Sequence, residues 1–141
     1  MLKVIVLVFS FINLSYCIHG SVEIDELSFD RVVSKFKTAI VKFDTQFPYG
    51  IDHEEWTNFV SQINNKSISD TDTDNILTAI VGIKDFGEFD NKQLGERYGV
   101  KDVFPSIKMF LNGDLTKAID FPVCKYFSIL NVDFSSKLLS C

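Results

Sequence analysis

The stretch 76–83 constrains the fold of this chain most strongly, because it is apolar on both faces. It reads Ile-Leu-Thr-Ala-Ile-Val-Gly-Ile, with apolar side chains at consecutive rather than alternate positions. Such a run is typical of a parallel strand that helices cover on both sides, since neither face meets water. It therefore predicts a layered fold in which a central sheet lies between helices.

Patterns on either side of this run predict the other elements. Short alternating or apolar runs predict strands over 22–24, 39–43, 107–111 and 118–121. Apolar residues spaced along one helix face predict helices over 29–36, 52–63, 91–98 and 127–138. The polar segment 64–75 has no apolar period and predicts a loop.

Short signals predict where these elements begin, end or turn. Ser28 is a candidate N-cap for the first helix, and Asp52 and Glu55 have the spacing of a capping box at the start of the second. Gly99 suits the end of the third helix. Asn112-Gly113 predicts a two-residue hairpin between the last two strands.

The order of the elements is strand, helix, strand, helix, strand, helix, hairpin, helix. A strand–helix–strand start gives a parallel core, and a hairpin adds antiparallel strands at the edge. The sequence therefore predicts an α/β fold with a mixed central sheet flanked by helices. In a domain of about 120 residues this order is the thioredoxin-like arrangement.

The N-terminus predicts a secretory signal peptide over residues 1–17. One positive charge, Lys3, precedes a run of about ten apolar residues, and small residues follow the run. A membrane anchor needs about 20 apolar residues, and polar side chains interrupt this run. We expect cleavage after Cys17, with Gly20 as the competing position. One thioredoxin-like domain over 18–141 then remains, without a membrane anchor.

Composition limits the function classes. The chain has 141 residues, of which 46% are hydrophobic, enough for one packed domain. Its net charge is -5 and becomes -6 when Lys3 leaves with the signal peptide. This charge argues against nucleic acid as a partner, because phosphate binding needs positive charge. Walker and dinucleotide-binding motifs are absent, and we expect no cofactor.

Thiol–disulfide chemistry is the obvious use of this fold, but the sequence lacks its reactive group. The attacking thiolate is needed at the start of the helix after the second strand. The segment 44–51 at that place contains no cysteine. Cys124 and Cys141 remain after signal removal, and a disulfide requires their Cα atoms to lie within about 7 Å. A helix between them separates them by roughly 25 Å, so we expect free or intermolecular thiols.

Metal binding and acid–base catalysis are not expected either. Asp70, Asp72 and Asp74 imitate the start of a calcium-binding loop, but Asn75 stands where that loop requires glycine. His53 has no second histidine at ligand spacing. We expect a protein that is not an enzyme, with no catalytic residue and no metal site.

Asn65-Lys66-Ser67 is an acceptor sequence for N-linked glycosylation. A second one, Asn13-Leu14-Ser15, leaves with the signal peptide. Because the signal peptide directs the chain into the oxidising secretory compartment, Asn65 is a candidate glycosylation site.

Aromatic residues beside prolines remain as candidates for binding. Phe47-Pro48-Tyr49 follows the second strand, at the loop where the catalytic groups of a redox relative would lie, and Phe104-Pro105 precedes a later strand. Exposed aromatics on a rigid segment suit apolar peptides, because they bury area with little loss of conformational entropy. The alternative is that Phe47 and Tyr49 pack on the neighbouring helix, and the sequence leaves both open.

Several blocks of the sequence, in the same order, resemble one family. They are residues 25–29, 41–44, 47–50, 81–87 and 104–107. These blocks resemble the endoplasmic reticulum protein 29 family, called Windbeutel in insects, over residues 21–112. The stretch Phe-Pro-Tyr-Gly is the specific one, because the family has Tyr-Pro-Tyr-Gly in place of a redox motif.

The resemblance implies a thioredoxin-fold member of the protein disulfide isomerase superfamily that lacks the redox motif. Such proteins are homodimeric chaperones or escorts of secretory proteins and peptides in the endoplasmic reticulum. The family's peptide-binding aromatics map to Phe47 and Tyr49, beside Pro48, and Phe47 stands where the family has tyrosine. Pro105 matches the proline that is cis in thioredoxin-like domains and joins this site. Asp25 matches an acidic residue of the family's dimer contact.

The C-terminal part departs from the family. The resemblance fades over 113–141, and the family's second, helical domain and its retrieval signal of the Lys-Asp-Glu-Leu type are absent from the sequence. We expect a short isoform, a truncated gene model or a divergent stand-alone domain. Its expected location is the lumen of the endoplasmic reticulum, with secretion as the alternative.

Three functions stay open, in order of preference. The first is a non-catalytic chaperone or escort that assists the folding, processing or transport of secretory proteins. The second is a thiol–disulfide oxidoreductase that uses Cys124. The third is a structural or regulatory fragment that dimerises with a longer sibling.

Overall fold

The computed structural model describes residues 20–67, 75–84, 91–100 and 104–121. The predicted signal peptide, the acidic run 70–74, both C-terminal cysteines and the predicted C-terminal helix lie outside these residues. Among the helices that the structure describes, none is both long enough and apolar enough to cross a membrane.

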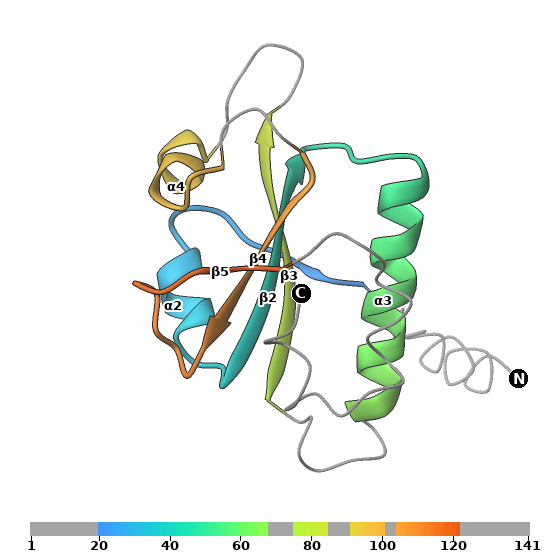
Figure 1. The fold of residues 1–141 in the computed structure, drawn as a ribbon, viewed down its shortest axis with the longest axis horizontal. Coiled ribbons are helices and arrows are strands. Elements are labelled where there is room, and N and C mark those ends of the chain that lie inside the picture. The colour runs from blue at the N-terminus through green and yellow to red at the C-terminus, as the bar shows by residue number, and fades with distance from the viewer. Residues whose placement is uncertain (1–19, 68–74, 85–90, 101–103, 122–141) are drawn as a thin grey trace, which may run out of the picture.

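The described strands form one mixed sheet in the order β1-β3-β2-β4-β5 (Figure 1). They are β1 (Val22–Glu23), β2 (Thr38–Thr45), β3 (Ile76–Lys84), β4 (Ser106–Leu111) and β5 (Ile119–Asp120). β1 and β2 run parallel to β3, whereas β4 is antiparallel to β2 and β5 is antiparallel to β4. The predicted α/β fold with a mixed central sheet is confirmed.

Helices cover both faces of the sheet, as the apolar run of β3 predicts. α3 (Ile51–Ser67) lies on one face, and α2 (Phe29–Val33) and α4 (Lys92–Arg97) lie on the other (Figure 1). Gly99 has a positive φ of 69° just after α4, which confirms its predicted place at the end of that helix.

Each face of the sheet has its own core, because side chains along β2 point alternately to opposite faces. Val41 and Phe43 belong to the cluster beneath α2 and α4. Ile40 belongs to the cluster beneath α3, together with Trp56 and Phe59. The central strand therefore connects two hydrophobic layers.

One of the two predicted helix starts is confirmed in position and the other is wrong. Ser28 occupies the predicted N-cap position of α2, although among the described residues its hydroxyl accepts no bond from a helix amide. It donates instead to Asp25 Oδ1 at 2.6 Å. α3 begins at Ile51, so Asp52 lies within its first turn and the capping box predicted with Glu55 is wrong.

Two predicted helix lengths are also wrong. α2 ends at Val33 rather than at 36, although Phe36 still packs on the adjacent core. α3 continues to Ser67, into the segment predicted to be a loop. A polar surface sequence continues a helix once its earlier turns are anchored by packing, which periodicity alone does not register.

The predicted two-residue hairpin at Asn112-Gly113 is wrong, although the turn exists. Both residues have positive φ, 54° and 69°, but β5 begins only at Ile119. The turn packs against the segment after α2, where the Asn112 amide donates to the Lys37 carbonyl at 2.7 Å. A Cβ on Gly113 would approach the Ser34 oxygen to 2.5 Å. This contact with the end of α2 directs the chain away from a tight hairpin.

The cluster of aromatic rings beneath α2 allows a first test of this fold. Phe29 is fully buried, and its ring lies 5.3 Å from Tyr98, 5.6 Å from Phe110 and 6.2 Å from Phe43. Phe29→Ala should lower the free energy of unfolding in urea by about 3–5 kcal/mol, because it leaves a cavity among three rings.

Leu27→Ala is the matched control for Phe29→Ala. Leu27 lies two residues away and is 81% exposed, so its truncation should change stability by less than about 0.5 kcal/mol. Equal losses in the two variants would contradict the described packing.

Candidate functional site

The strand directions bring the predicted site residues to one edge of the sheet. The three parallel strands end at this edge, and β4 begins there, since Ser106 pairs with Phe43 near the end of β2. Asp25 therefore follows β1, the loop 46–50 follows β2, and Pro105 precedes β4 at the same edge. In open α/β sheets, ligands bind beyond the carboxyl ends of the strands.

The loop after β2 presents apolar side chains to solvent. Phe47 is 67% exposed, Tyr49 is 90% exposed and the following Ile51 is 73% exposed, while Pro48 between the aromatics is half-buried. The alternative that Phe47 and Tyr49 pack on the neighbouring helix is therefore wrong. We call Phe47, Tyr49 and Ile51 the apolar loop surface.

Two glycines fix the path of this loop. Gly50 has φ of 86°, a conformation that side chains disfavour, and its carbonyl accepts the first amide bonds of α3 from His53 and Glu54 at 3.1 Å. Gly82 of β3 lets the loop pass close by, because a Cβ there would lie 3.2 Å from the Cα of Gln46.

A buried ion pair lies in β2, just before the loop. Lys42 is fully buried and its Nζ lies 2.6 Å from Oδ2 of Asp44, which is also buried. Among the described residues, Nζ donates no well-aligned hydrogen bond, so the contact with Asp44 is an ion pair. Nζ also lies 5.9 Å from the centre of the Trp56 ring. The other oxygen, Asp44 Oδ1, accepts the Thr45 amide at 2.7 Å, where the pairing with β3 is irregular.

Pro105 follows a cis peptide bond, as the family resemblance predicts. Phe104, on the other side of that bond, packs against the core beneath α2 and α4. Pro105 itself is half-buried, opposite the end of β2.

Asp25 lies on the turn between β1 and α2. Its Oδ1 accepts hydrogen bonds from the Ser28 hydroxyl at 2.6 Å and the Ser28 amide at 2.8 Å, and these bonds lower the pKa of the Asp25 carboxyl below its ordinary value. Asp25 is therefore a fixed, exposed negative charge. The link between Asp25 and Ser28 is a finding that the separate predictions for the two residues did not anticipate.

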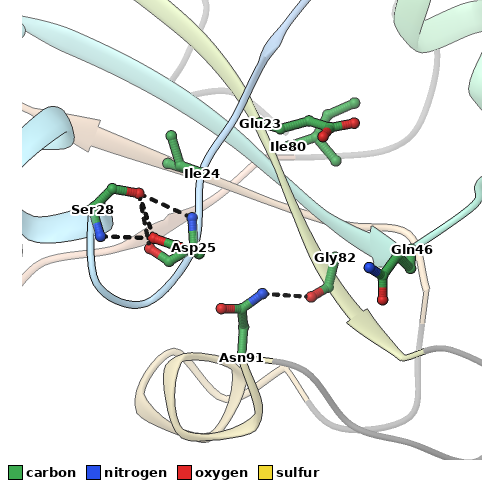
Figure 2. A pocket seen from close by; sticks show the side chains of 8 residues that line it. All are labelled: Glu23, Ile24, Asp25, Ser28, Gln46, Ile80, Gly82 and Asn91. Carbon is green, nitrogen blue, oxygen red and sulfur yellow. Dashed lines mark hydrogen bonds between the residues drawn. The ribbon is translucent and has the colours of Figure 1, made fainter.

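A cavity of about 300 Å³ opens between this turn and the loop after β2 (Figure 2). Its lining combines acidic, amide and apolar side chains: Glu23, Ile24, Asp25, Ser28, Gln46, Ile80, Gly82 and Asn91. Gln46 immediately precedes Phe47, so the cavity adjoins the apolar loop surface.

Asn91 holds the wall of this cavity together. It has a left-handed backbone, with φ of 53°, at the start of α4. Its Nδ2 donates to the Gly82 carbonyl at 2.8 Å, as Figure 2 shows, and its Oδ1 accepts the Glu26 amide at 2.8 Å. One side chain thus ties β3 and α4 to the turn that carries Asp25.

The other chemical candidates lie apart from this edge or lack partners. Asn65 is exposed in the last turn of α3, at the opposite end from the apolar loop surface. His53 is half-buried in the first turn of α3, and its Nδ1 has no hydrogen-bond partner among the described residues. Within the part of the chain that the structure describes, no group of His, Cys, Asp or Glu is arranged to hold a metal ion.

Sequence reasoning missed Lys42, Asp44 and Asn91. Two charged residues inside the apolar run of β2 were a visible signal for a buried pair. Asn91 gave no such signal, because its role depends on a contact with Glu26, 65 residues away in the chain.

Comparison with known proteins identifies the family. The model of the ERp29 N-terminal domain matches residues 16–133. The chain belongs to the ERp29 family. It is 44% identical over 104 residues to protein windbeutel of Drosophila melanogaster, a match that covers 73% of this chain and 38% of windbeutel. The chain thus spans well under half the length of that relative, within a family of endoplasmic reticulum proteins related to disulfide isomerases.

Solved structures confirm the thioredoxin-like fold. A thioredoxin mutant from Halobacterium salinarum superposes with a TM-score of 0.56 at 12% identity, covering 80% of this chain and 87% of the thioredoxin. The first thioredoxin domain of mouse protein disulfide-isomerase A4 gives 0.55 at 17% identity, covering 74% of this chain and 65% of that one.

The buried pair of β2 generates a stability test. Asp44→Asn should lower the free energy of unfolding by about 3–5 kcal/mol, because it leaves the Lys42 ammonium buried without an opposite charge. Replacing both residues, Lys42→Met with Asp44→Leu, should recover most of that loss, since neither charge is then buried.

Asp30→Asn is the control for this ion pair. Asp30 and Arg97 also approach to 2.7 Å, but both side chains are about half exposed, so the loss should stay below about 1 kcal/mol. A small loss for Asp44→Asn, equal to that of the control, would contradict a dry ion pair beneath the loop.

Proposed function

We propose that the protein is a non-catalytic chaperone or escort of the endoplasmic reticulum lumen. It binds secretory proteins or peptides and assists their folding, processing or transport. The observation that carries the proposal is the exposure of Phe47 and Tyr49 on the loop after β2. Membership of the ERp29 family and the N-terminal segment typical of a signal peptide support the location.

The geometry of the loop supports binding of apolar segments. Aromatic side chains bury a large area with few rotatable bonds, so binding costs them little conformational entropy. Pro48 and the Gly50 turn restrict the backbone between them, and the half-buried Pro105 lies at the same edge of the sheet. A client segment therefore meets a surface that is largely formed before binding.

The same loop argues against enzymatic thiol exchange. A thioredoxin-like enzyme needs a thiolate at the start of the helix that follows β2. Residues 44–51 contain no cysteine, and an aromatic–proline–aromatic sequence occupies this place. The proposed activity is therefore binding alone.

Homodimerisation through the edge that carries Asp25 belongs to the same proposal. β1 is an edge strand of the described sheet, and Val22 and Leu27 on either side of Asp25 are exposed. Apolar side chains around a fixed negative charge suit a specific contact with a second copy.

Tyr49→Ala tests the proposal. It should weaken binding of a fluorescent, unfolded peptide rich in aromatic and aliphatic residues by about tenfold or more, the equivalent of about 1.4 kcal/mol. The midpoint of thermal unfolding should stay unchanged, because Tyr49 contributes almost no buried area. Fluorescence anisotropy and a melting curve measure the two effects.

Ile119→Ala serves as the control, since Ile119 is an exposed aliphatic side chain but lies on β5, outside the apolar loop surface and the proposed dimer contact. It should leave peptide affinity unchanged. Wild-type affinity in Tyr49→Ala, or a loss of affinity that follows a loss of stability, would contradict the proposed site.

A further inference from the structure

We propose that Asn65 carries an N-linked oligosaccharide, which the solvent-facing side of the last turn of α3 accommodates. This modification rests on the proposed entry into the endoplasmic reticulum but not on the proposed client binding, because it concerns the opposite end of the helix. Asn65 lies in an acceptor sequence, is exposed in the folded chain, faces away from the buried side of α3 and lies far from the apolar loop surface.

The helical register directs Asn65 away from the core. Ile63 is buried beneath α3, and each residue advances about 100° around the helix axis, so Asn65 lies roughly 200° away from it. Asn65 is exposed in the folded chain. A bulky, hydrated group on its side chain therefore displaces none of the contacts of Trp56, Phe59 or Ile63.

Accommodation matters because this modification is made on the chain as it enters the secretory compartment, before folding is complete. A sequon whose asparagine faces the core would trap the chain unfolded once it carried a sugar. Asn65 avoids this conflict, since the buried positions of α3 fall on the other side of the helix. The two chemical requirements, an acceptor sequence and an outward asparagine, are met at the same residue.

The reaction uses a lipid diphosphate-linked oligosaccharide and the membrane oligosaccharyltransferase of the secretory pathway. The Asn65 Nδ2 forms a bond to the anomeric carbon of the first sugar. The bond from that carbon to the diphosphate oxygen breaks, and the lipid diphosphate leaves. The amide nitrogen loses one proton, which an enzyme base accepts, and no atom is oxidised or reduced.

The position of Asn65 keeps the oligosaccharide away from the client site. At about 1.5 Å per residue, Asn65 lies roughly 20 Å along α3 from Ile51, at the far end of the helix. Figure 1 shows that α3 begins beside the end of β2 and runs from there along the sheet. The sugar thus covers a polar face of the molecule and leaves Phe47 and Tyr49 open.

The test is expression of the full chain in insect cells, with electrophoresis before and after peptide-N-glycosidase treatment. The wild-type chain should migrate as a slower band that the glycosidase converts to the faster one. Asn65→Gln and Ser67→Ala should each remove the slower band, because each changes a different essential residue of the acceptor sequence. Mass spectrometry of the glycosidase product should show Asp at position 65.

Asn64→Gln is the matched control, because it changes the neighbouring asparagine and leaves the sequon intact. It should keep the slower band, as should Asn13→Gln, which alters the sequon of the signal segment. A single fast band for the wild-type chain, in cells that glycosylate a co-expressed reporter, overturns the proposal. A slower band that persists in Asn65→Gln overturns it as well. So does a chain that protease digests in the presence of intact membrane vesicles, because such a chain has not entered the secretory compartment.

Absence of the glycan can be told apart from a failure of the client-binding proposal. The affinity of Phe47 and Tyr49 for peptides is measured on protein made in bacteria, which carries no such sugar. Loss of the glycan and loss of peptide binding are therefore separate outcomes.

Discussion

The burial of β2 on both faces is the constraint on which the rest of this structure depends. β2 pairs with β3 on one side and with β4 on the other, and side chains along it enter two separate cores. Because both faces are dry, its register cannot slip by one residue without turning Phe43 and Lys42 to the wrong sides. The place where β2 ends, and hence where the loop leaves the sheet, is fixed by packing.

A fixed exit point explains how one fold serves different chemistry. In thioredoxin-like enzymes this exit presents a thiolate at a helix start, whereas this chain presents Phe47 and Tyr49. The framework holds either set of side chains equally well, so fold alone does not determine function. The buried Lys42–Asp44 pair lies just before the end of β2, and the Asp44 carboxylate accepts the amide of Thr45, the last residue of the strand. The ion pair therefore links the buried part of β2 to the point where the loop begins.

Local sequence patterns predict much of this framework. The apolar run of β3 predicts a central parallel strand, and the apolar spacing from Trp56 to Ile63 predicts α3, because both depend on periodic burial. Features set by contacts between distant segments escape such patterns. The prediction of a two-residue hairpin is wrong because Gly113 packs against Ser34. The exposure of Tyr49 could not be decided from the sequence, because the same residues can lie on an open surface or pack on a neighbouring helix.

The central claim is that the edge where β2 ends binds apolar segments through side chains that are exposed beforehand. Its most direct test is an amide NMR spectrum of the ¹⁵N-labelled chain, titrated with an unlabelled, unfolded aromatic-rich peptide. The account predicts that the largest shift changes occur at the amides of residues 46, 47, 49–51, 104 and 106, since Pro48 and Pro105 have no amide proton, with little change around β5. Changes centred elsewhere, or none at saturating peptide, would contradict it.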